Sequence, residues 1–273
     1  MTSGTRDQWL ERHRTLGDYE RVGYAGLGEE YNKWIYRLRR RHFLRLAGRH
    51  KIDSRCRILD VGSGTGFYVG LYRDLNVRSI HGADISPEAV KSLSRRFPDA
   101  TFAACDIGAG LPSPVAEAAP FDVVSAMDVL YHITDDNQWK RAVRNCGEAV
   151  APGGLLLISD NFPTRPVPVT ATQSFHTFSE HASILKEQGF RLVEMSPVFL
   201  LSNGQVGSGI GYAGFALWWW LFKRVLGGTL RSARSVGEPL GAVSGAVLTT
   251  IDAMLQRQSV WTGYSTKVAV FRR

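Results

Sequence analysis

Several features that mark specialised proteins are scarce or missing in these 273 residues. The three cysteines, Cys56, Cys105 and Cys146, are an odd number at wide spacing, which fits neither a disulfide framework nor a cysteine metal cluster. No histidine pair has the spacing of a metal site on a helix face, so no metal is expected, and no internal repeat is visible. The first residues are polar and lack the apolar core of a secretory signal. We therefore expect a cytoplasmic protein.

Positive charge is present in excess but is unevenly distributed. The formal net charge is +8, with 14 Lys and Arg against 7 acids in residues 1–57, 11 against 16 in residues 58–194, and 8 against 2 in residues 195–273. Basic flanks on either side of an acidic centre favour an anionic partner, because they raise its local concentration. The alternative is that the charge serves solubility alone.

One short motif indicates a cofactor site. An apolar run that ends in Asp60 is followed by glycines at alternate positions, Gly62, Gly64 and Gly66. This arrangement is typical of a strand that leads into a tight turn, where a nucleotide-type ligand approaches the backbone. A dinucleotide fingerprint has its third glycine one position later, where this chain has Phe67, so a nicotinamide cofactor is disfavoured.

Further acids follow in order. About 20 residues past the turn, a second apolar segment ends in Asp84, where doubly wound nucleotide folds place a carboxylate against the ribose hydroxyls. Ser86 and Pro87 then predict a helix start, with Ser86 as the N-cap. A third apolar segment ends in Asp106.

In this order, the landmarks resemble the class I methyltransferases of the small-molecule type, which use S-adenosyl-L-methionine. By resemblance, Asp106 accepts a hydrogen bond from the adenine amino group and Ile107 packs beside the ring. The residues expected to bind the cofactor are Asp60, Gly62, Ser63, Gly64, Gly66, Asp84, Ile85, Asp106, Ile107, Met127, Tyr131, Tyr19 and Tyr24.

The expected fold class is α/β, with a doubly wound, Rossmann-like sheet of seven strands, mostly parallel, in which the last strand is antiparallel. The predicted strands are 57–61, 79–83, 101–105, 121–127, 155–159, 190–195 and 265–272, and the predicted helices between them are 66–75, 87–97, 137–150 and 179–188. The predicted regions are an amino-terminal lid at 1–52, the cofactor-binding domain at 53–196 and 264–273, and an apolar, basic insertion at 197–263.

The amino-terminal region is predicted to form a helix over residues 31–46 that ends at Gly48. Tyr19 and Tyr24, which are interleaved with glycines, are expected to belong to a lid over the cofactor and substrate. The arginines of the helix are expected to form a solvated face.

The insertion contains the least polar stretch of the chain, residues 212–226 with Trp218 to Trp220, and a second apolar segment at 240–255. Its charged Lys223 and the glycines before it disfavour a transmembrane helix. Three roles stay open: a cap over the substrate pocket, which is favoured, a homodimer interface through residues 210–255, or a peripheral membrane contact. The basic residues that could receive an anionic end of the substrate are Lys223, Arg224, Arg231 and Arg234.

A sulfonium methyl group is already a strong electrophile, so the enzyme mainly has to position a nucleophile and exclude water. Where the nucleophile is a hydroxyl or ammonium group, a base must remove a proton. His132 and His176 are the candidate bases, and Asp160 could orient either one. An equally good interpretation of His132 is a hydrogen bond to nearby backbone.

The expected substrate is a small, partly apolar and anionic metabolite of natural-product or isoprenoid type. Methyltransferases for base amines commonly carry Asn or Asp, two prolines and an aromatic residue after the fourth strand, whereas residues 125–128 read Ser-Ala-Met-Asp, so nucleic acid is disfavoured. A membrane-associated lipid methyltransferase and a non-catalytic cofactor-binding protein remain the alternatives.

Overall fold

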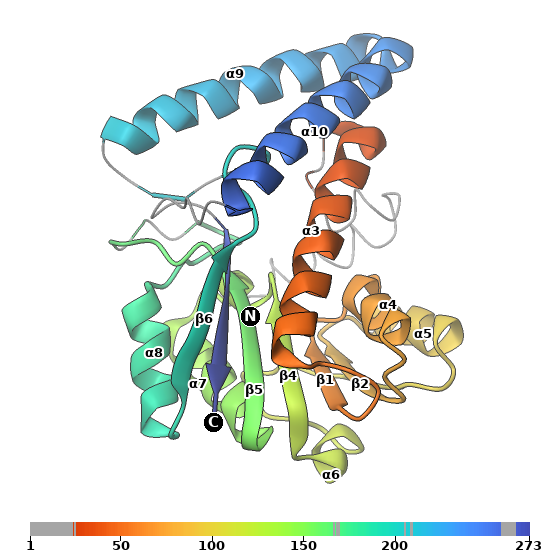
Figure 1. Cartoon of the computed structure of the whole chain (residues 1–273), viewed down its shortest axis with the longest axis vertical. Coiled ribbons are helices and arrows are strands. Elements are labelled where there is room, and N and C mark those ends of the chain that lie inside the picture. Colours follow the sequence, from red (N-terminus) through yellow and green to blue (C-terminus); the bar gives the residue numbers. More distant parts are fainter. Residues whose placement is uncertain are drawn as a thin grey trace.

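A central sheet with helices on both faces forms the body of the protein (Figure 1). The computed structural model describes residues 24, 26–165, 167, 170–204, 206–207, 210–257 and 266–273. The sheet has the strand order β3-β2-β1-β4-β5-β7-β6. Its strands are β1 (Arg57–Val61), β2 (Ser79–Asp84), β3 (Thr101–Ala104), β4 (Phe121–Met127), β5 (Val150–Asp160), β6 (Arg191–Pro197) and β7 (Lys267–Arg272).

The first five strands pair in parallel, and β7 runs antiparallel between β5 and β6. The predicted fold class is therefore confirmed. The prediction for β5 was too short, because the Pro-Gly-Gly sequence at residues 152–154 resembles a turn. The strand instead begins at Val150, which pairs with Phe121, and Gly153 stays within it at a φ of 77°.

Helices cover the sheet in two groups, each with its own buried core. Alternate strand residues enter opposite cores, as the period of two requires: Ile58 packs with α3, α4 and α5, whereas Leu59 packs with α6, α7 and α8. These helices and the short 3₁₀ helix are α3 (Gly28–His50), α4 (Phe67–Asp74), α5 (Pro87–Arg96), α6 (Val115–Ala118), η1 (Leu130–His132), α7 (Asp136–Glu148) and α8 (Phe178–Glu187).

The amino-terminal helix α3 is longer than predicted. Gly48 does not end it; the helix continues to His50, and Lys51 ends it in the left-handed conformation at a φ of 56°. Its first turn has no side-chain cap of its own. The carboxylate of Glu238 accepts hydrogen bonds from the backbone N–H groups of Glu29 and Glu30 instead, at 3.4 and 3.0 Å.

Glu238 belongs to a helical hairpin formed by α9 (Ile210–Ser232) and α10 (Arg234–Arg257), which lies beyond the carboxyl ends of the parallel strands (Figure 1). α10 packs along α3 through small residues: a Cβ on Gly241 would lie 3.4 Å from Tyr31, and one on Gly245 would lie 3.0 Å from Trp34. Helix α3 is thus held between the sheet and the hairpin. Within the described residues, neither helix of the hairpin is apolar over a length sufficient to cross a membrane.

Candidate active site

A cavity of about 510 Å³ opens at the carboxyl ends of β1, β2 and β4, under α3. In parallel α/β sheets, this edge is where ligands bind. Among the predicted cofactor residues, those that line it are Gly62, Ser63, Gly64, Asp84, Ile85, Asp106, Ile107, Met127, Tyr131 and Tyr24. Two others, Asp60 and Gly66, lie outside the lining, and Tyr19 falls outside the described residues.

The glycine turn has a backbone that few other residues could adopt. Gly62, Gly64 and Gly66 all have positive φ, at 71°, 53° and 81°. A Cβ on Gly62 would lie 2.2 Å from a methyl carbon of Val129, which itself lines the cavity. Gly66 is the N-cap of α4. The turn therefore exposes bare backbone to the cavity and leads directly into a helix N-terminus.

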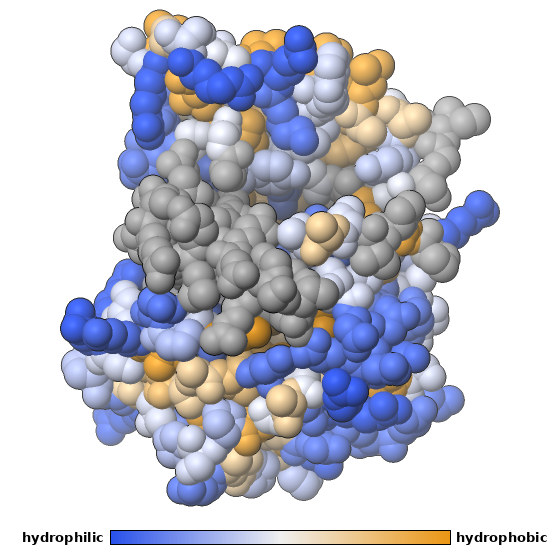
Figure 2. Space-filling model, turned by 180° about the vertical axis from the view of Figure 1, so that it is seen from behind, coloured by the Kyte–Doolittle hydropathy of each residue, from blue (hydrophilic) through white to orange (hydrophobic). Residues whose placement is uncertain are grey.

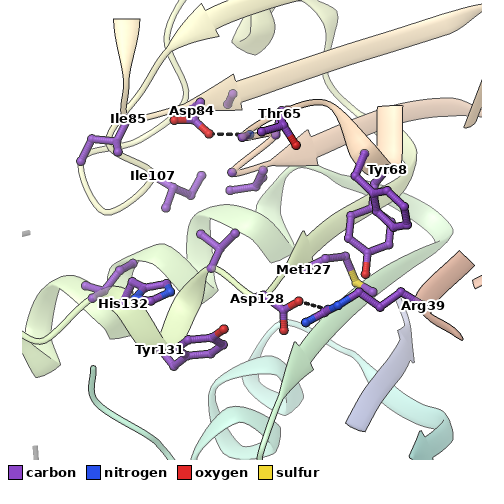
Figure 3. A pocket seen from close by; sticks show the side chains of 18 of the residues that line it. Arg39, Thr65, Tyr68, Asp84, Ile85, Ile107, Met127, Asp128, Tyr131 and His132 are labelled. Atoms are coloured by element: carbon purple, nitrogen blue, oxygen red, sulfur yellow. Dashed lines mark hydrogen bonds and ion pairs between the residues drawn. The ribbon is translucent and has the colours of Figure 1, made fainter. Parts of the chain in front are cut away.

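Two carboxylates stand opposite this turn at the ends of β2 and β3. Asp84, which lies beside the turn in Figure 3, accepts a hydrogen bond from Gly64 N–H at 2.7 Å on one oxygen. Its other oxygen accepts one from Ser86 N–H at 2.9 Å. Asp106 accepts from Gly108 N–H at 3.0 Å and from the Gln138 amide at 2.6 Å. Both carboxylates line the cavity, and an ionised carboxylate is a hydrogen-bond acceptor.

Asp60 supports the turn from behind. It is buried, its Oδ1 accepts a hydrogen bond from Ser125 Oγ at 2.7 Å, and its backbone oxygen accepts one from Ser63 Oγ at 2.8 Å. Burial raises the pKa of Asp60 to about 7.

An ion pair between Arg39 of α3 and Asp128 after β4 occupies the far wall of the cavity (Figure 3). Asp128 has an unusual backbone for a residue other than glycine, with a φ of 61°, and its carboxylate accepts a hydrogen bond from Ser159 Oγ at 2.8 Å. Burial alone would lower the pKa of Arg39, but the adjacent Asp128 raises it well above its usual value. The Arg39 Nε is buried and has no hydrogen-bond partner among the described residues.

Arg39 corrects the expectation that the α3 arginines form a solvated face. Its side chain is only 10% exposed, because α3 passes over the strand ends. The sequence does contain a signal for this placement: the polar residues Asn32, Tyr36 and Arg39 recur at helical spacing, and all three line the cavity.

Aromatic side chains and His132 complete the wall. Phe67, Tyr68 and Tyr131 line the cavity with Tyr36, and burial raises the pKa of the Tyr131 hydroxyl well above its usual value. The ring nitrogen Nδ1 of His132 lies 3.1 Å from the Thr172 carbonyl oxygen. If Nδ1–H donates to this oxygen, the basic lone pair is on Nε2.

The other two predicted catalytic residues lie outside the cavity lining. The His176 ring stacks on Trp139, with centroids 3.5 Å apart. Asp160 is fully buried; its Oδ2 lies 3.8 Å from His181 Nε2, and burial raises its pKa to about 8. Asp160 therefore orients neither His132 nor His176, and the geometry leaves His132 as the candidate base of the three.

The predicted insertion contacts the cavity through its first loop and not through the described parts of its two helices. Asn203 lines the cavity, but none of the described residues of α9 and α10 does. Trp219 instead packs edge-on against the ring of Tyr24, with centroids 5.4 Å apart. The hairpin thus forms a second layer behind the pocket wall.

Comparison of the sequence with models of known protein families identifies the class of protein to which this fold and site belong. A family model described as a methyltransferase domain matches residues 31–195, which is more than half of the chain. The chain therefore belongs to this family, the class I S-adenosylmethionine-dependent methyltransferases.

Individual relatives are more distant. A ubiquinone biosynthesis O-methyltransferase from Caulobacter sp. (strain K31) is 31% identical over 38% of this chain and 40% of its own length. The structure of the N-methyltransferase NodS from Bradyrhizobium japonicum WM9 with S-adenosyl-L-homocysteine is 16% identical, covers 97% of this chain and 98% of its own, and has a TM-score of 0.54. The Burkholderia thailandensis 1,6-didemethyltoxoflavin-N1-methyltransferase is 14% identical, with coverages of 98% and 86% and a TM-score of 0.54. The chain spans about two fifths of the length of the curated relatives it matches.

The residues of the cavity fit S-adenosylmethionine, the cofactor of the family. The Asp84 oxygens can accept hydrogen bonds from a ribose diol, and Ile85 and Ile107 offer an apolar slot for a purine ring. The bare backbone at Gly62 and Gly64 permits close approach of the ligand.

Proposed function

We propose that this protein transfers the methyl group of S-adenosylmethionine to a small, partly apolar and anionic metabolite of natural-product or isoprenoid type. The observation that carries the proposal is the division of one cavity into two parts. Glycine backbone and the carboxylates of Asp84 and Asp106 form one side, and aromatic rings with the Arg39–Asp128 pair form the other. The first side suits the cofactor, and the second is available to an acceptor molecule.

The acceptor side has the chemistry of an apolar pocket with one charged anchor. Among the described lining residues, Arg39 is the only Arg or Lys, and its Nε is buried without a partner. A guanidinium has five N–H donors, so it can hold Asp128 and also donate to a carboxylate of a ligand. The rings of Tyr36, Tyr68 and Tyr131 favour a flat, partly apolar body beside that carboxylate.

His132 is the residue that we propose removes the proton from an acceptor hydroxyl. With Nδ1–H directed at the Thr172 carbonyl, Nε2 is the basic atom. The curated relatives are ubiquinone biosynthesis O-methyltransferases, and this likeness favours an oxygen acceptor here as well.

The bound cofactor supplies an electrophilic methyl group on a sulfonium. The residues of this chain then have to hold the acceptor in line with that carbon, exclude water and take up a proton at His132 Nε2. The half-buried ion pair between α3 and the end of β4 keeps two walls of the pocket in fixed relation. Orientation, rather than activation of the methyl group, is thus the main contribution of the protein.

The exposed neighbour of Arg39 offers a matched test. Arg40 lies next to it on α3 but points to solvent, where it pairs with Asp74. In a methyl-transfer assay, we expect the wild type to prefer carboxylated phenols over the corresponding amides. Arg39→Gln should lower the ratio of the two kcat/KM values by roughly 10- to 100-fold, as for loss of a charged hydrogen bond. Arg40→Gln should keep the preference.

The carboxylate that Arg39 binds could belong to the substrate or to the cofactor, and calorimetry with S-adenosylhomocysteine separates these two cases. If Arg39→Gln weakens this affinity tenfold or more and leaves the acid-over-amide preference intact, Arg39 holds the cofactor and the anionic-substrate proposal is wrong. Because Asp128 loses its partner in Arg39→Gln, Arg39→Lys is measured beside it to keep the charge pair.

A further inference from the structure

The outward face of the α9–α10 hairpin carries a run of large apolar side chains in contact with solvent. On α10, such residues recur every three or four positions, as on one face of a helix. The exposed apolar residues of α10 are Val236, Leu240, Val243, Val247, Ile251 and Met254, and those of this face on α9 are Leu217, Trp220, Leu221 and Val225. Figure 2 shows apolar side chains along the top of the molecule, over this hairpin, with hydrophilic ones beside them.

Within the described part of the chain, the packing of the fold does not use this face. The opposite side of α10 is the one that packs on α3, through Gly241, Gly245 and the buried Thr249. Its end is fixed by Asp252, whose carboxylate accepts hydrogen bonds from the backbone N–H groups of Leu201 and Ser202. Val243, by contrast, is 64% exposed. An apolar surface that packs on no other described element marks a binding surface.

The charges around this face have one sign. Among the described residues, Arg224 and Arg231 are exposed on the hairpin, and the exposed Arg234 is paired with Glu238. Both acids of the described hairpin are already engaged: Asp252 is buried on the loop at residues 201–202, and Glu238 caps α3 and pairs with Arg234. The free charge next to the apolar face is therefore positive, and its complement is an anionic surface.

We propose that the outward face of the α9–α10 hairpin docks on the surface of an anionic phospholipid bilayer. Apolar side chains would enter the headgroup boundary, with Trp220 at headgroup level and Arg224 and Arg231 on lipid phosphates. A second copy of the chain fits less well, because a twofold interface places the same patch against itself and brings like charges together. This proposal does not depend on the identity of the methyl acceptor.

Docking at this face would place the membrane on the same end of the molecule as the cavity, since the hairpin lies beyond the carboxyl ends of the strands (Figure 1). The inner face of α9 already contacts the pocket wall, through Trp219 and Tyr24. A partly apolar acceptor dissolved in the bilayer would thus be close to the cavity.

The test is co-sedimentation of the full chain with vesicles of phosphatidylcholine alone or mixed with phosphatidylglycerol. We expect binding to the anionic vesicles that weakens with added salt. Arg224→Gln combined with Arg231→Gln should weaken it about 25-fold, which is fivefold for each cation. The control is Arg191→Gln, an exposed arginine at the start of β6, far along the sheet from the hairpin.

The apolar contribution has its own pair of variants. Val243→Ser with Val247→Ser should weaken vesicle binding roughly tenfold or more, because both side chains leave the bilayer boundary. Leu192→Ser on β6, an exposed apolar residue outside the hairpin, should not change it.

Equal sedimentation with neutral and anionic vesicles, or binding that neither double variant weakens, would overturn the proposal. So would a dimer in analytical ultracentrifugation that Val243→Ser with Val247→Ser disperses while vesicle binding is absent, since a second copy would then be the occupant. Circular dichroism melting of each variant confirms that the fold is retained.

Discussion

Replacement of Gly62 by alanine tests the geometry of the glycine turn most sharply. Gly62 has a φ of 71°, and an added Cβ would lie 2.2 Å from Val129 Cγ2. Two separate costs follow. A residue with a Cβ in the left-handed region costs about 1–2 kcal/mol, and overpacking against Val129 costs about 1–3 kcal/mol. The expected loss in the free energy of unfolding is therefore about 2–5 kcal/mol.

A double-mutant cycle separates these two costs. Val129→Ala removes the methyl group that the new Cβ meets, so Gly62→Ala should be less destabilising in its presence by about 1–3 kcal/mol, with the backbone cost left over. Gly70→Ala is the control, because Gly70 lies within α4 with nothing within 4 Å of its added Cβ. It should stabilise the protein by about 0.4–1 kcal/mol.

Urea unfolding followed by circular dichroism measures the free energy of unfolding of the wild type, the two single variants and the double variant of the cycle. Calorimetry with S-adenosylhomocysteine measures ligand binding by the same four proteins. A cost for Gly62→Ala below about 0.5 kcal/mol, or a coupling energy near zero, would refute the turn geometry described for this site.

Three further predictions concern the carboxylates and the base. Burial raises the pKa of Asp60 to about 7, so the folded state keeps a proton that the unfolded state has lost above about pH 4, and wild-type stability falls as pH rises through this window. Asp60→Asn does not titrate, so its stability relative to wild type should rise by at most about 4 kcal/mol between pH 4 and pH 7; a pH-independent difference in urea unfolding would contradict this. Asp84→Ala should weaken S-adenosylhomocysteine binding by roughly 10- to 100-fold in calorimetry, and unchanged affinity would remove Asp84 from the cofactor site. His132→Gln should lower kcat by about 10²- to 10⁴-fold with unchanged S-adenosylhomocysteine affinity, and an unaltered kcat would show that His132 is not the base.

Much of the fold could be predicted because its signals are local. Strand β1 was predicted with its observed bounds, since an apolar run between polar residues and a glycine turn has few other solutions. The N-cap at Ser86 was predicted from one hydroxyl residue before Pro87, and its side chain accepts from Ala89 N–H. Local signals failed where pairing decides: β5 begins early because a neighbouring strand continues beside it.

The site was predictable where sequence spacing fixes it and unpredictable where tertiary packing does. Gly64 and Asp84 meet because consecutive parallel strands end at one edge, and a hydrogen bond of 2.7 Å joins them. Helical spacing places Asn32, Tyr36 and Arg39 on one face of α3. That this face lies over the strand ends, where Arg39 pairs with Asp128 from 89 residues further along the chain, depends on tertiary packing. The imidazole of His176 could act as a base, but it stacks on Trp139, which only the structure shows.

The most direct measurement is a calorimetric titration of the full chain with S-adenosylhomocysteine, beside the Gly64→Arg and Gly70→Ala variants. The account predicts saturable binding by the wild type and by Gly70→Ala, and none by Gly64→Arg, because a long side chain at a φ of 53° would fill the turn that faces Asp84. Absence of binding by the wild type, or equal affinity in Gly64→Arg, would contradict the assignment of this cavity to the cofactor.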